Sequence, residues 1–347
     1  MKRVLADLNI AELEAVAIGY GQPKFRGGQL LRWIGRGAVH FEEMTDLPKS
    51  FRDEIAVSYE TGIPAIVDKV YSKKDGVVKY IFSAQDGNVV EGVLMRYKHG
   101  FTACISSQAG CRMGCRFCAS KPEGFSRGLS CGEMLGQVLA MNRDLGERIG
   151  NVVVMGIGEP FDNYDNCLKF ARLLHENPEA GIGYRKVTVS TCGVVPGIYR
   201  LAGEGLPIGL SVSLNAPNDE VRDIIMPINR KHRIKELLEA CNTYICKTGR
   251  RVTFEYAMIS GVNDHDAHAR EVAAKLKNML CHVNLIPVNR VEGSGFMPSS
   301  RLQISRFEGI LQSGGVNATI RRTLGADIGA ACGQLRKMSI QGYEKQR

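Results

Sequence analysis

From about residue 98 onward, the chain alternates short apolar runs with longer amphipathic stretches. The apolar runs have the length and the Val/Ile content of buried strands, and they cover 101–107, 151–156, 186–191, 207–213, 251–259, 282–288 and 318–322. Helical periodicity predicts helices at 131–145, 163–176, 218–225, 234–247, 265–279 and 299–313. Alternating strands and helices form parallel β/α structures. The pattern therefore predicts an α/β fold, either an incomplete barrel or an open doubly wound sheet, with an active site at the carboxyl ends of the strands.

The chain before residue 98 follows two other patterns. Residues 1–62 carry the periodicity of short helices, at 9–16, at 29–34 and after Leu47-Pro48. Residues 63–97 change to strand-like alternation, with hairpin turn signals at Asp75-Gly76 and Asp86-Gly87. We expect three regions: an N-terminal helical accessory domain at 1–62, a β-hairpin extension at 63–97, and a core at 98–347 that ends in a segment with a catalytic cysteine.

Composition indicates a soluble globular protein, with 44% hydrophobic and 23% charged residues. No apolar run approaches the ~20 residues of a membrane span, so we expect a cytoplasmic protein without a membrane partner. The net charge of +9 favours a polyanionic partner. The stretch between Glu14 and Glu42 holds no acid, and its basic and aromatic residues are Lys24, Phe25, Arg26, Arg32, Trp33 and Arg36. This composition fits an RNA-contacting module, and it fits a solvated basic face equally well.

The chain has eleven cysteines, and its first residues lack the apolar core of a signal peptide, so we expect metal or catalytic roles for clustered cysteines rather than disulfides. Cys111, Cys115 and Cys118 form a C-x3-C-x2-C motif just after the first strand of the β/α region. A [4Fe-4S] cluster normally takes four cysteines, so three local thiolates leave one iron open, where the amino and carboxylate groups of S-adenosylmethionine (SAM) could bind. The alternative is a zinc site in an RNA-binding module, but zinc needs a fourth ligand and no second pair follows.

This cysteine motif, with an aromatic residue before the last cysteine, resembles the radical SAM superfamily. Three further segments are similar to the dual-specificity 23S rRNA/tRNA adenine-C2 methyltransferases, and they are Cys104–Cys111, Met155–Pro160 and Ala330–Leu335. The resemblance extends from Pro23 to Gln334. It implies an incomplete (βα)6 radical SAM barrel, a [4Fe-4S] cluster held by the three cysteines of the motif, and two SAM molecules per turnover.

The resemblance also implies a division of labour among three catalytic residues. Cys332 first takes a methyl group from one SAM. A radical derived from the second SAM removes a hydrogen from that methyl, and the resulting carbon radical adds to the base. Cys104 then attacks the Cys332 sulfur, which forms a transient disulfide and frees the methylated base. Glu91, in a Val-Glu pair that matches the family, would remove the ring proton. From the sequence alone Glu91 reads as an exposed strand carboxylate.

The SAM contacts that the resemblance implies lie at the ends of the predicted strands. They are Gly158, Glu159, Ser190, Ser213, Leu214, Asn215 and Asn289. A glycine there lets the backbone approach a ligand closely, and Glu159 can accept from an ammonium group. The chain departs from many relatives at Asn215, where they have His. The remaining six cysteines carry no motif and are expected to be structural: Cys131, Cys167, Cys192, Cys241, Cys246 and Cys281.

The expected function is therefore methylation of adenine carbon 2 in 23S rRNA, at the peptidyl transferase centre, and of the adenine 3′ of the anticodon in tRNAs. The main rival is methylation at carbon 8, the antibiotic-resistance type. Pro160 follows the Gly-x-Gly-Glu sequence, where that sister family has Ala, and it favours carbon 2. The implied partners are 23S rRNA, tRNA and a one-electron donor such as flavodoxin or ferredoxin, and the enzyme is expected to be a monomer.

Overall fold

The computed structural model describes residues 2–84, 86–120, 124–291, 293–335 and 338–339. Most of its strands belong to one sheet in the order β14-β13-β12-β11-β10-β9-β6-β5-β4-β3, with β15 (Met338–Ser339) on β5. Residues 340–347, the end of the expected core region, lie outside the described residues.

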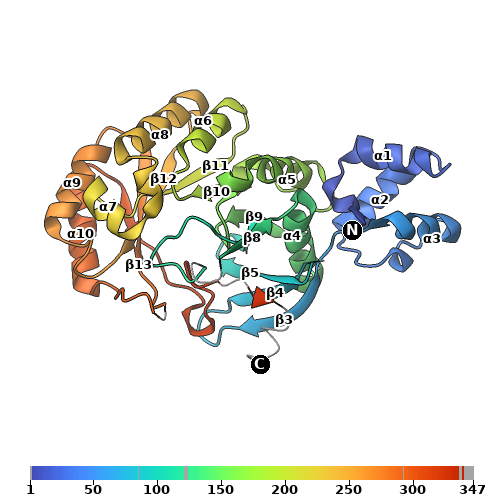
Figure 1. Cartoon of the computed structure of the whole chain (residues 1–347), viewed down its shortest axis with the longest axis horizontal. Helices are drawn as coiled ribbons and strands as arrows, with labels where there is room; N and C mark the ends of the chain where they lie inside the picture. The colour runs from blue at the N-terminus through green and yellow to red at the C-terminus, as the bar shows by residue number, and fades with distance from the viewer. Residues whose placement is uncertain (1, 85, 121–123, 292, 336–337, 340–347) are drawn as a thin grey trace.

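The half of the sheet from β6 to β14 is parallel throughout. Its strands are β6 (Gly100–Ile105), β9 (Ile149–Val154), β10 (Val187–Thr191), β11 (Gly209–Ser213), β12 (Val252–Met258), β13 (Cys281–Pro287) and β14 (Ala318–Ile320). The helices between them are α4 (Cys131–Leu145), α5 (Tyr164–Glu176), α6 (Val195–Gly203), α7 (Asp219–Ile225), α8 (Ile234–Thr248), α9 (Asp266–Leu276) and α10 (Arg301–Ser313). Figure 1 shows the helices around the outside of the strands. This architecture confirms the predicted incomplete β/α barrel.

Among the helices α4 to α10, α6 is the one that the periodicity did not predict. It begins Val195-Pro196-Gly197, and proline and glycine mark turns more often than helices. Proline is tolerated in a first helical turn, because its missing N–H has no intrahelical partner there. Gly197 permits close packing, since a Cβ at this position would lie 2.5 Å from Cγ of Phe161.

The segment before the barrel is an antiparallel continuation of the same sheet. It consists of β3 (Ala65–Tyr71), β4 (Val78–Ser83) and β5 (Asn88–Tyr97). The turns at Asp75-Gly76 and Asp86-Gly87 join these strands, and both glycines have positive φ. Strand β5 then pairs antiparallel with β6, and Val93 lies opposite Cys104. The expected extension therefore adds its strands directly to the first barrel strand.

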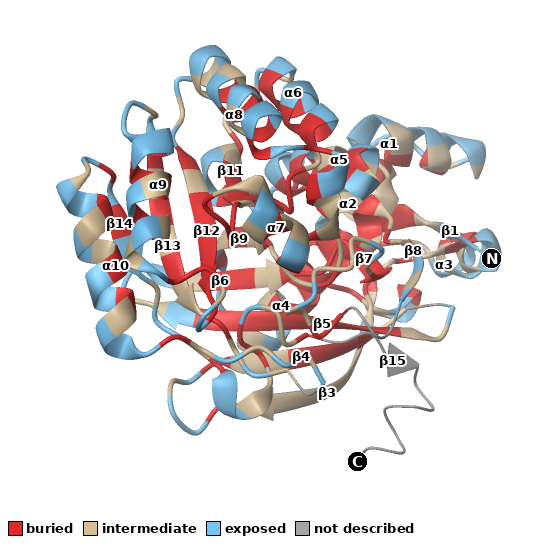
Figure 2. Ribbon diagram, turned by 60° about the vertical axis from the view of Figure 1, so that its left-hand side comes forward, coloured by how far each residue is buried: buried red, intermediate tan, exposed pale blue. Residues whose placement is uncertain are grey.

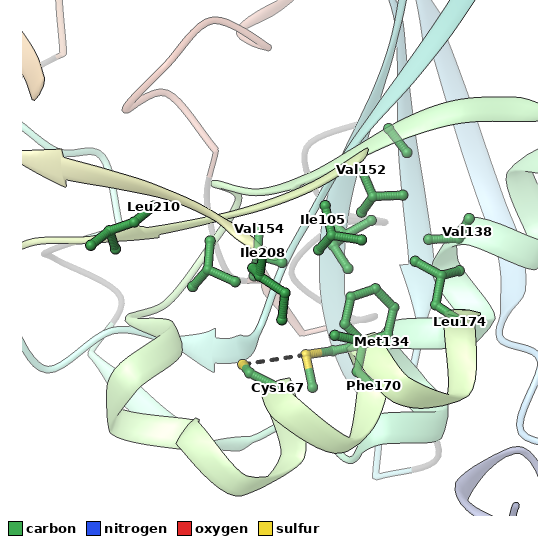
Figure 3. Packing of buried hydrophobic residues seen from close by; sticks show 14 of the residues in the cluster. Ile105, Met134, Val138, Val152, Val154, Cys167, Phe170, Leu174, Ile208 and Leu210 are labelled. Atoms are coloured by element: carbon green, nitrogen blue, oxygen red, sulfur yellow. Dashed lines mark hydrogen bonds between the residues drawn. The ribbon is translucent and has the colours of Figure 1, made fainter. Parts of the chain in front are cut away.

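The main core lies between the sheet and its helices. Figure 2 shows β11, β12 and β13 buried, while α6 and α8 expose their outer faces. Between α4 and α5 the core is filled by sulfur and apolar side chains, and the Cys167 thiol donates to Met134 Sδ at 3.8 Å (Figure 3). Of the six cysteines expected to be structural, Cys246 is exposed and the other five are buried.

Three helices precede the sheet and lie to one side of the barrel in Figure 1: α1 (Ile10–Gly19), α2 (Arg26–Gly35) and α3 (Lys49–Ser58). The short helix η1 (Leu5–Asp7) joins them to α4, because the Asp7 carboxylate accepts from the Cys131 thiol at 3.1 Å. Within the described ranges, none of the helices combines the length and apolar character that a membrane span requires.

The basic residues on α2 and next to it come from a stretch of sequence without acids. In the structure, three of them are ion-paired. They form exposed ion pairs with acids elsewhere, namely Lys24 with Glu14, Arg32 with Asp46 and Arg36 with Glu179. The Trp33 indole donates to Asp46 at 2.5 Å. Exposed ion pairs are weak, so these cations remain able to exchange an acidic partner for a phosphate.

Candidate active site

A cavity of about 230 Å³ opens at the carboxyl ends of the barrel strands. Its wall includes the three cysteines of the motif, Cys104, Cys332 and side chains that follow β9 to β14. Parallel strands bring their carboxyl ends to one edge, which is why residues more than two hundred positions apart meet here. Position in the fold and chemistry both make this cavity the candidate active site.

The motif cysteines share one wall of this cavity on the loop after β6. The loop is anchored because the Arg116 N–H donates to the carbonyl of Ile225, at the end of α7, at 2.9 Å. Burial raises the pKa of Cys111 to about 12 and also raises the pKa of Cys115, so both are neutral thiols until a metal takes their protons. Among the described residues, no group of three His, Cys, Asp or Glu is arranged around a single metal ion. A cubane binds each cysteine at a different iron, so a donor set of three spaced thiols fits it.

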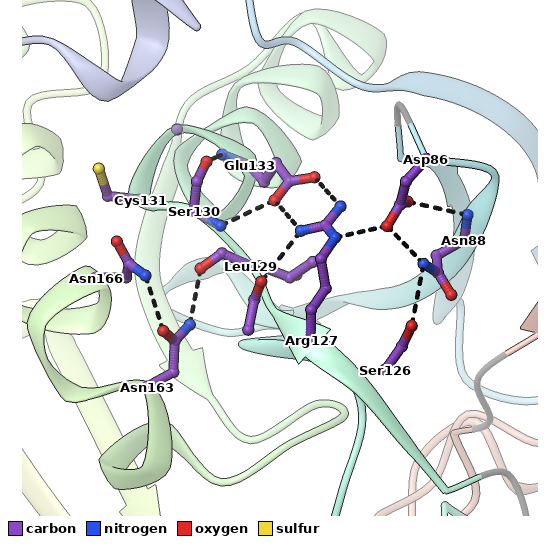
Figure 4. Close-up of polar contacts among 12 residues, drawn as sticks. Asp86, Asn88, Ser126, Arg127, Leu129, Ser130, Cys131, Glu133, Asn163 and Asn166 are labelled. Atoms are coloured by element: carbon purple, nitrogen blue, oxygen red, sulfur yellow. Dashed lines mark hydrogen bonds and ion pairs between the residues drawn. The ribbon is translucent and has the colours of Figure 1, made fainter. Parts of the chain in front are cut away.

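The three cysteines lie between two short paired strands, β7 (Gln108–Gly110) and β8 (Phe125–Gly128). On β8, the Arg127 guanidinium binds both carboxylate oxygens of Glu133 at 2.7 Å and Asp86 at 2.6 Å (Figure 4). Glu133 lies in the first turn of α4 and Asp86 in the β4–β5 turn. The pKa of Asp86 falls to about 2, chiefly through the hydrogen bond from Arg127. This ionic cluster therefore fixes the return of the cysteine loop against two neighbouring elements.

Gly158 and Glu159 follow β9 on the wall of the cavity. Gly158 has φ +111°, and a Cβ there would lie 2.7 Å from Gln108. Glu159 is 2% exposed, and its carboxylate accepts from the backbone N–H of Phe161 at 3.0 Å and of Cys192 at 2.7 Å. Burial raises the pKa of Glu159, while these two donors oppose the shift. A fixed carboxylate at a cavity wall can hold an ammonium group such as the SAM amine.

The other predicted SAM contacts divide into two groups. Ser190, Ser213 and Asn215 line the cavity. Leu214 does not lie on its described wall, because its side chain packs into the main core with 1% exposure. The Asn215 side chain is largely engaged within the protein, where its amide oxygen accepts from the Ala257 N–H at 2.7 Å. Asn215 also has φ 56°. Asn and His are both enriched at positive φ, so the backbone explains why either residue can occupy this position.

Asn289, after β13, lines the cavity and contacts the segment that carries Cys332. Its side-chain amide donates to the Cys332 carbonyl at 3.0 Å. Two more hydrogen bonds join the same segment to the end of the cysteine loop, from Ala119 N to Gly333 O at 2.7 Å and from Ser120 Oγ to Leu335 O at 2.9 Å. The exposed Cys332 is thus held over the predicted cluster ligands from two sides.

Cys104 lies on β6 and lines the same cavity as Cys332. Burial raises the pKa of Cys104 to about 12, the nearby Cys332 adds to the shift, and Arg321 opposes it. Arg321, just after β14, also lines the cavity, and its Nη1 lies 3.6 Å from Glu255 Oε2. Arg321 therefore brings a positive charge close to both sulfurs.

Glu91 does not lie on the described cavity wall. It is 2% exposed on β5, on the same side of the strand as Val93 and Met95, which do line the cavity. Its Oε1 lies 3.0 Å from the ammonium of Lys79 on β4. The sequence alone predicts an exposed strand carboxylate at position 91. That prediction is wrong, because Glu91 is buried in an ion pair beside the cavity.

Sequence reasoning missed Tyr97 and Arg321 on the cavity wall, and it missed Lys79 beside Glu91. It also missed Arg222 on α7, which is fully buried and donates to the carbonyls of Cys192, Ser213 and Leu214 at 2.7 to 3.1 Å. Arg222 thereby ties together the ends of β10 and β11. An arginine in a short helix beside acidic residues gives no sequence signal that it will be buried.

The radical SAM superfamily model matches residues 105–272, and the model of the ribosomal RNA large subunit methyltransferase N-terminal domain matches residues 4–60. The chain is 48% identical over 342 residues to the probable dual-specificity RNA methyltransferase RlmN of Clostridium tetani, covering 99% of this chain and 98% of the relative. The corresponding protein of Pelotomaculum thermopropionicum is 51% identical, covering 97% and 92%.

A solved structure carries the same fold. It is that of a radical SAM methyltransferase from Sphaerobacter thermophilus, with a TM-score of 0.92 and 45% identity over 96% of this chain and 99% of that one. Enzymes of this superfamily use a [4Fe-4S] cluster and SAM, and the cavity offers thiols, a buried carboxylate and strand-end polar groups that suit both. Identity and coverage at this level show that the chain belongs to the radical SAM superfamily and, within it, to the RlmN family of dual-specificity RNA methyltransferases.

Proposed function

We propose that the chain methylates carbon 2 of adenine in 23S rRNA, at the peptidyl transferase centre, and in tRNAs, at the adenine 3′ of the anticodon. The observation that carries this proposal is the shared cavity of Cys104, Cys332 and the three motif cysteines. Carbon 2 lies between two ring nitrogens and is too electron-poor to attack a sulfonium methyl. A radical route through a thiol-bound methyl avoids that obstacle.

Cys332 is the methyl acceptor in this scheme. It is exposed at the cavity, and its segment is held by Asn289 and by the end of the cysteine loop. Its thiolate would attack the methyl carbon of one SAM, so that Cys332 gains the methyl group and S-adenosylhomocysteine leaves. The cluster, held by Cys111, Cys115 and Cys118, would supply the electron that cleaves a second SAM. Glu159 would orient the amine of SAM, with Gly158 allowing close backbone approach and Ser190, Ser213, Asn215 and Asn289 supplying the remaining contacts.

Cys104 and Glu91 act after the carbon–carbon bond has formed. Cys104 would attack the Cys332 sulfur, so that a disulfide forms and the carbon–sulfur bond breaks. The electron pair of that bond stays with the carbon, which takes a proton and becomes the methyl group on the base. Arg321 lines the cavity with both sulfurs, and a nearby cation favours the attacking thiolate. Glu91 would accept the proton of ring carbon 2, and the adjoining Lys79 ammonium would hold that carboxylate in its charged form.

We place the enzyme in the cytoplasm, where its RNA substrates and a reduced flavodoxin or ferredoxin are available, and we expect it to act as a monomer. The N-terminal helices would contribute RNA contacts through Lys24, Arg26, Arg32 and Arg36. The match of residues 4–60 to an N-terminal domain of ribosomal RNA methyltransferases supports this role. The three-region division, with residues 63–97 as an extension of the core, is part of the same proposal.

The test is anaerobic reconstitution with iron, sulfide, SAM and a reductant, followed by incubation with a 23S rRNA fragment or a tRNA transcript. Digestion to nucleosides and chromatography with mass spectrometry should give 2-methyladenosine. A product that co-elutes with 8-methyladenosine would establish the rival carbon-8 activity, which the RlmN relatives do not favour. A colourless, zinc-loaded protein without product would establish the zinc RNA-binding alternative.

A further inference from the structure

The tight turn between β5 and β6 carries four aromatic or basic side chains in a row beside the cavity. Its sequence is Arg96-Tyr97-Lys98-His99-Gly100, and Tyr97 pairs with Gly100 across the two-residue turn. Gly100 has φ +112°, a conformation that favours glycine. The turn is short, and neither the proposed catalytic steps nor the SAM contacts use it.

Two rings of this turn form a stack that leads out of the cavity. Tyr97 lies on the cavity wall and its hydroxyl donates to Met95 Sδ at 3.6 Å. The His99 ring stacks on Tyr97, with ring centroids 5.4 Å apart and an interplanar angle of 9°. Tyr97 is half-buried whereas His99 is exposed. The stack thus begins inside the active site and ends with an imidazole in solvent.

The charges around this stack suit a nucleic acid. Lys98 is exposed in the turn, whereas the exposed Arg96 lies on the opposite face of β5 from Tyr97, with its guanidinium 5.7 Å from the centroid of Phe101. Arg322, which is also exposed, lies on the cavity wall. Positive side chains interleaved with aromatic rings are typical of surfaces that bind single-stranded nucleic acid, where the cations meet phosphates and the rings meet bases.

We propose that His99, stacked on Tyr97, is a platform for the RNA base that adjoins the target adenine. The inference rests on the proposed function, because it requires that an adenine enters the cavity. A base can reach a buried catalytic centre only by leaving its own stack, and this removes a stacking partner from its neighbour. The exposed face of His99 at the mouth of the cavity replaces that partner and holds the unstacked RNA.

The experiment measures the affinity of the cluster-loaded enzyme for a labelled tRNA anticodon stem–loop at fixed salt. His99→Ala should weaken binding by about tenfold, the size expected for one base–aromatic stack. His99→Phe keeps an aromatic ring at this position and should bind within about twofold of wild type. The matched control is His175→Ala. His175 is also exposed and lies against a tyrosine, Tyr184, at 4.2 Å between centroids, but it does not line the cavity.

A second arm uses stem–loops that lack the base on the 5′ or the 3′ side of the target adenine. One of these abasic RNAs should bind wild type and His99→Ala equally, because the stack is already lost. The proposal is overturned if His99→Ala binds intact RNA as wild type does, if His99→Phe loses as much affinity as His99→Ala, or if both abasic RNAs still distinguish wild type from His99→Ala. Methylation of Cys332 without RNA should be unchanged in every variant. If wild type itself does not methylate Cys332, that result would count against the proposed function. The binding measurements would still decide whether His99 stacks on an RNA base.

Discussion

The Asn289 side-chain amide donates a hydrogen bond of 3.0 Å to the carbonyl oxygen of Cys332. This bond joins the end of β13 to the segment that carries the proposed methyl acceptor. Resemblance alone assigns Asn289 to SAM binding. An asparagine amide has two donor hydrogens and an acceptor oxygen, so the same side chain can position Cys332 and contact SAM. We therefore propose that Asn289 links the SAM site to the segment that carries Cys332.

Asn289→Ala should slow methylation of Cys332 by about fivefold, since a hydrogen bond of about 1 kcal/mol to the segment is lost. The mass of the Cys332 peptide after timed incubation with SAM reports the rate. Iron content should stay at the wild-type level, because Asn289 lies outside the cysteine motif. Unchanged methylation kinetics would show that the bond to the Cys332 carbonyl does not position the thiol.

Cys115→Ala should abolish cluster binding and the formation of 5′-deoxyadenosine, since the remaining two motif thiols cannot hold a [4Fe-4S] cluster. Iron and sulfide analysis and chromatography of the SAM products measure the two losses. Cys246→Ala is the matched control, because Cys246 is exposed on α8 and lies off the cavity wall. A full complement of iron in Cys115→Ala would refute the assignment of the cluster ligands.

Arg127→Met should lower the free energy of unfolding by about 2 kcal/mol at pH 7, because Arg127 binds two carboxylates in a partly buried cluster. Part of this effect depends on pH. The pKa of Asp86 is about 2 in the folded protein against 3.8 for a free Asp, so this contribution is complete above about pH 4 and disappears as the pH falls toward 2.

Chemical denaturation of cluster-free wild type and Arg127→Met at several pH values tests the direction of this pH dependence. The difference between the two proteins should shrink between about pH 4 and pH 2. Arg200→Met provides the control, since Arg200 forms an exposed pair with Asp165 at 2.6 Å and should cost little at any pH. A difference for Arg127→Met that stays constant down to pH 2 would contradict the role of Asp86.

The strands and most helices of the barrel could be predicted from the sequence because buried parallel strands are continuous apolar runs and their helices are amphipathic. Helix α6 escaped prediction because Pro196, Gly197 and Gly203 hide its periodicity. The joining of β5 to β6 could not be foreseen either. Strand periodicity shows which side of a strand is buried, but it does not show which strands pair.

The site could be predicted where residues are close in sequence. Cys111, Cys115 and Cys118 fall within one loop, so their spacing alone indicates a metal site. The approach of Cys332 to the cysteine loop depends on hydrogen bonds across the fold, and only the family resemblance pointed to it. Arg222 and Lys79 carried no motif. Both are cations drawn into the interior by oxygen partners that lie on other elements.

Cys104→Ala should stall the reaction after the carbon–carbon bond has formed. Cys332 should still accept its methyl, but no thiol would be placed to attack the Cys332 sulfur. The expected species is a covalent protein–RNA adduct that survives denaturing electrophoresis and disappears on RNase treatment. Cys332→Ala should form neither the methylated peptide nor the adduct. If Cys104→Ala is folded, cluster-loaded and free of RNA after turnover conditions, Cys104 is not the resolving thiol.

Lys79→Met should also accumulate the covalent adduct, for a different reason. Its ammonium lies 3.0 Å from Oε1 of Glu91, and the two side chains are 15% and 2% exposed. Removing this charge from a buried carboxylate disfavours the charged form that must accept the ring proton. Cys332 methylation and 5′-deoxyadenosine formation precede that proton transfer, so both should keep wild-type rates while release of methylated RNA slows by about tenfold or more.

Lys79→Arg separates this positioning role from a structural one, because Arg keeps the positive charge on the same strand. It should restore release of methylated RNA to within a few-fold of wild type, since guanidinium and ammonium both pair with carboxylates. Glu91→Gln should accumulate the same adduct as Lys79→Met, and the double variant should be no slower than Glu91→Gln, because both changes act on one proton transfer. If Lys79→Met instead loses iron or Cys332 methylation in parallel with product release, Lys79 only stabilises the sheet and Glu91 acts without its help.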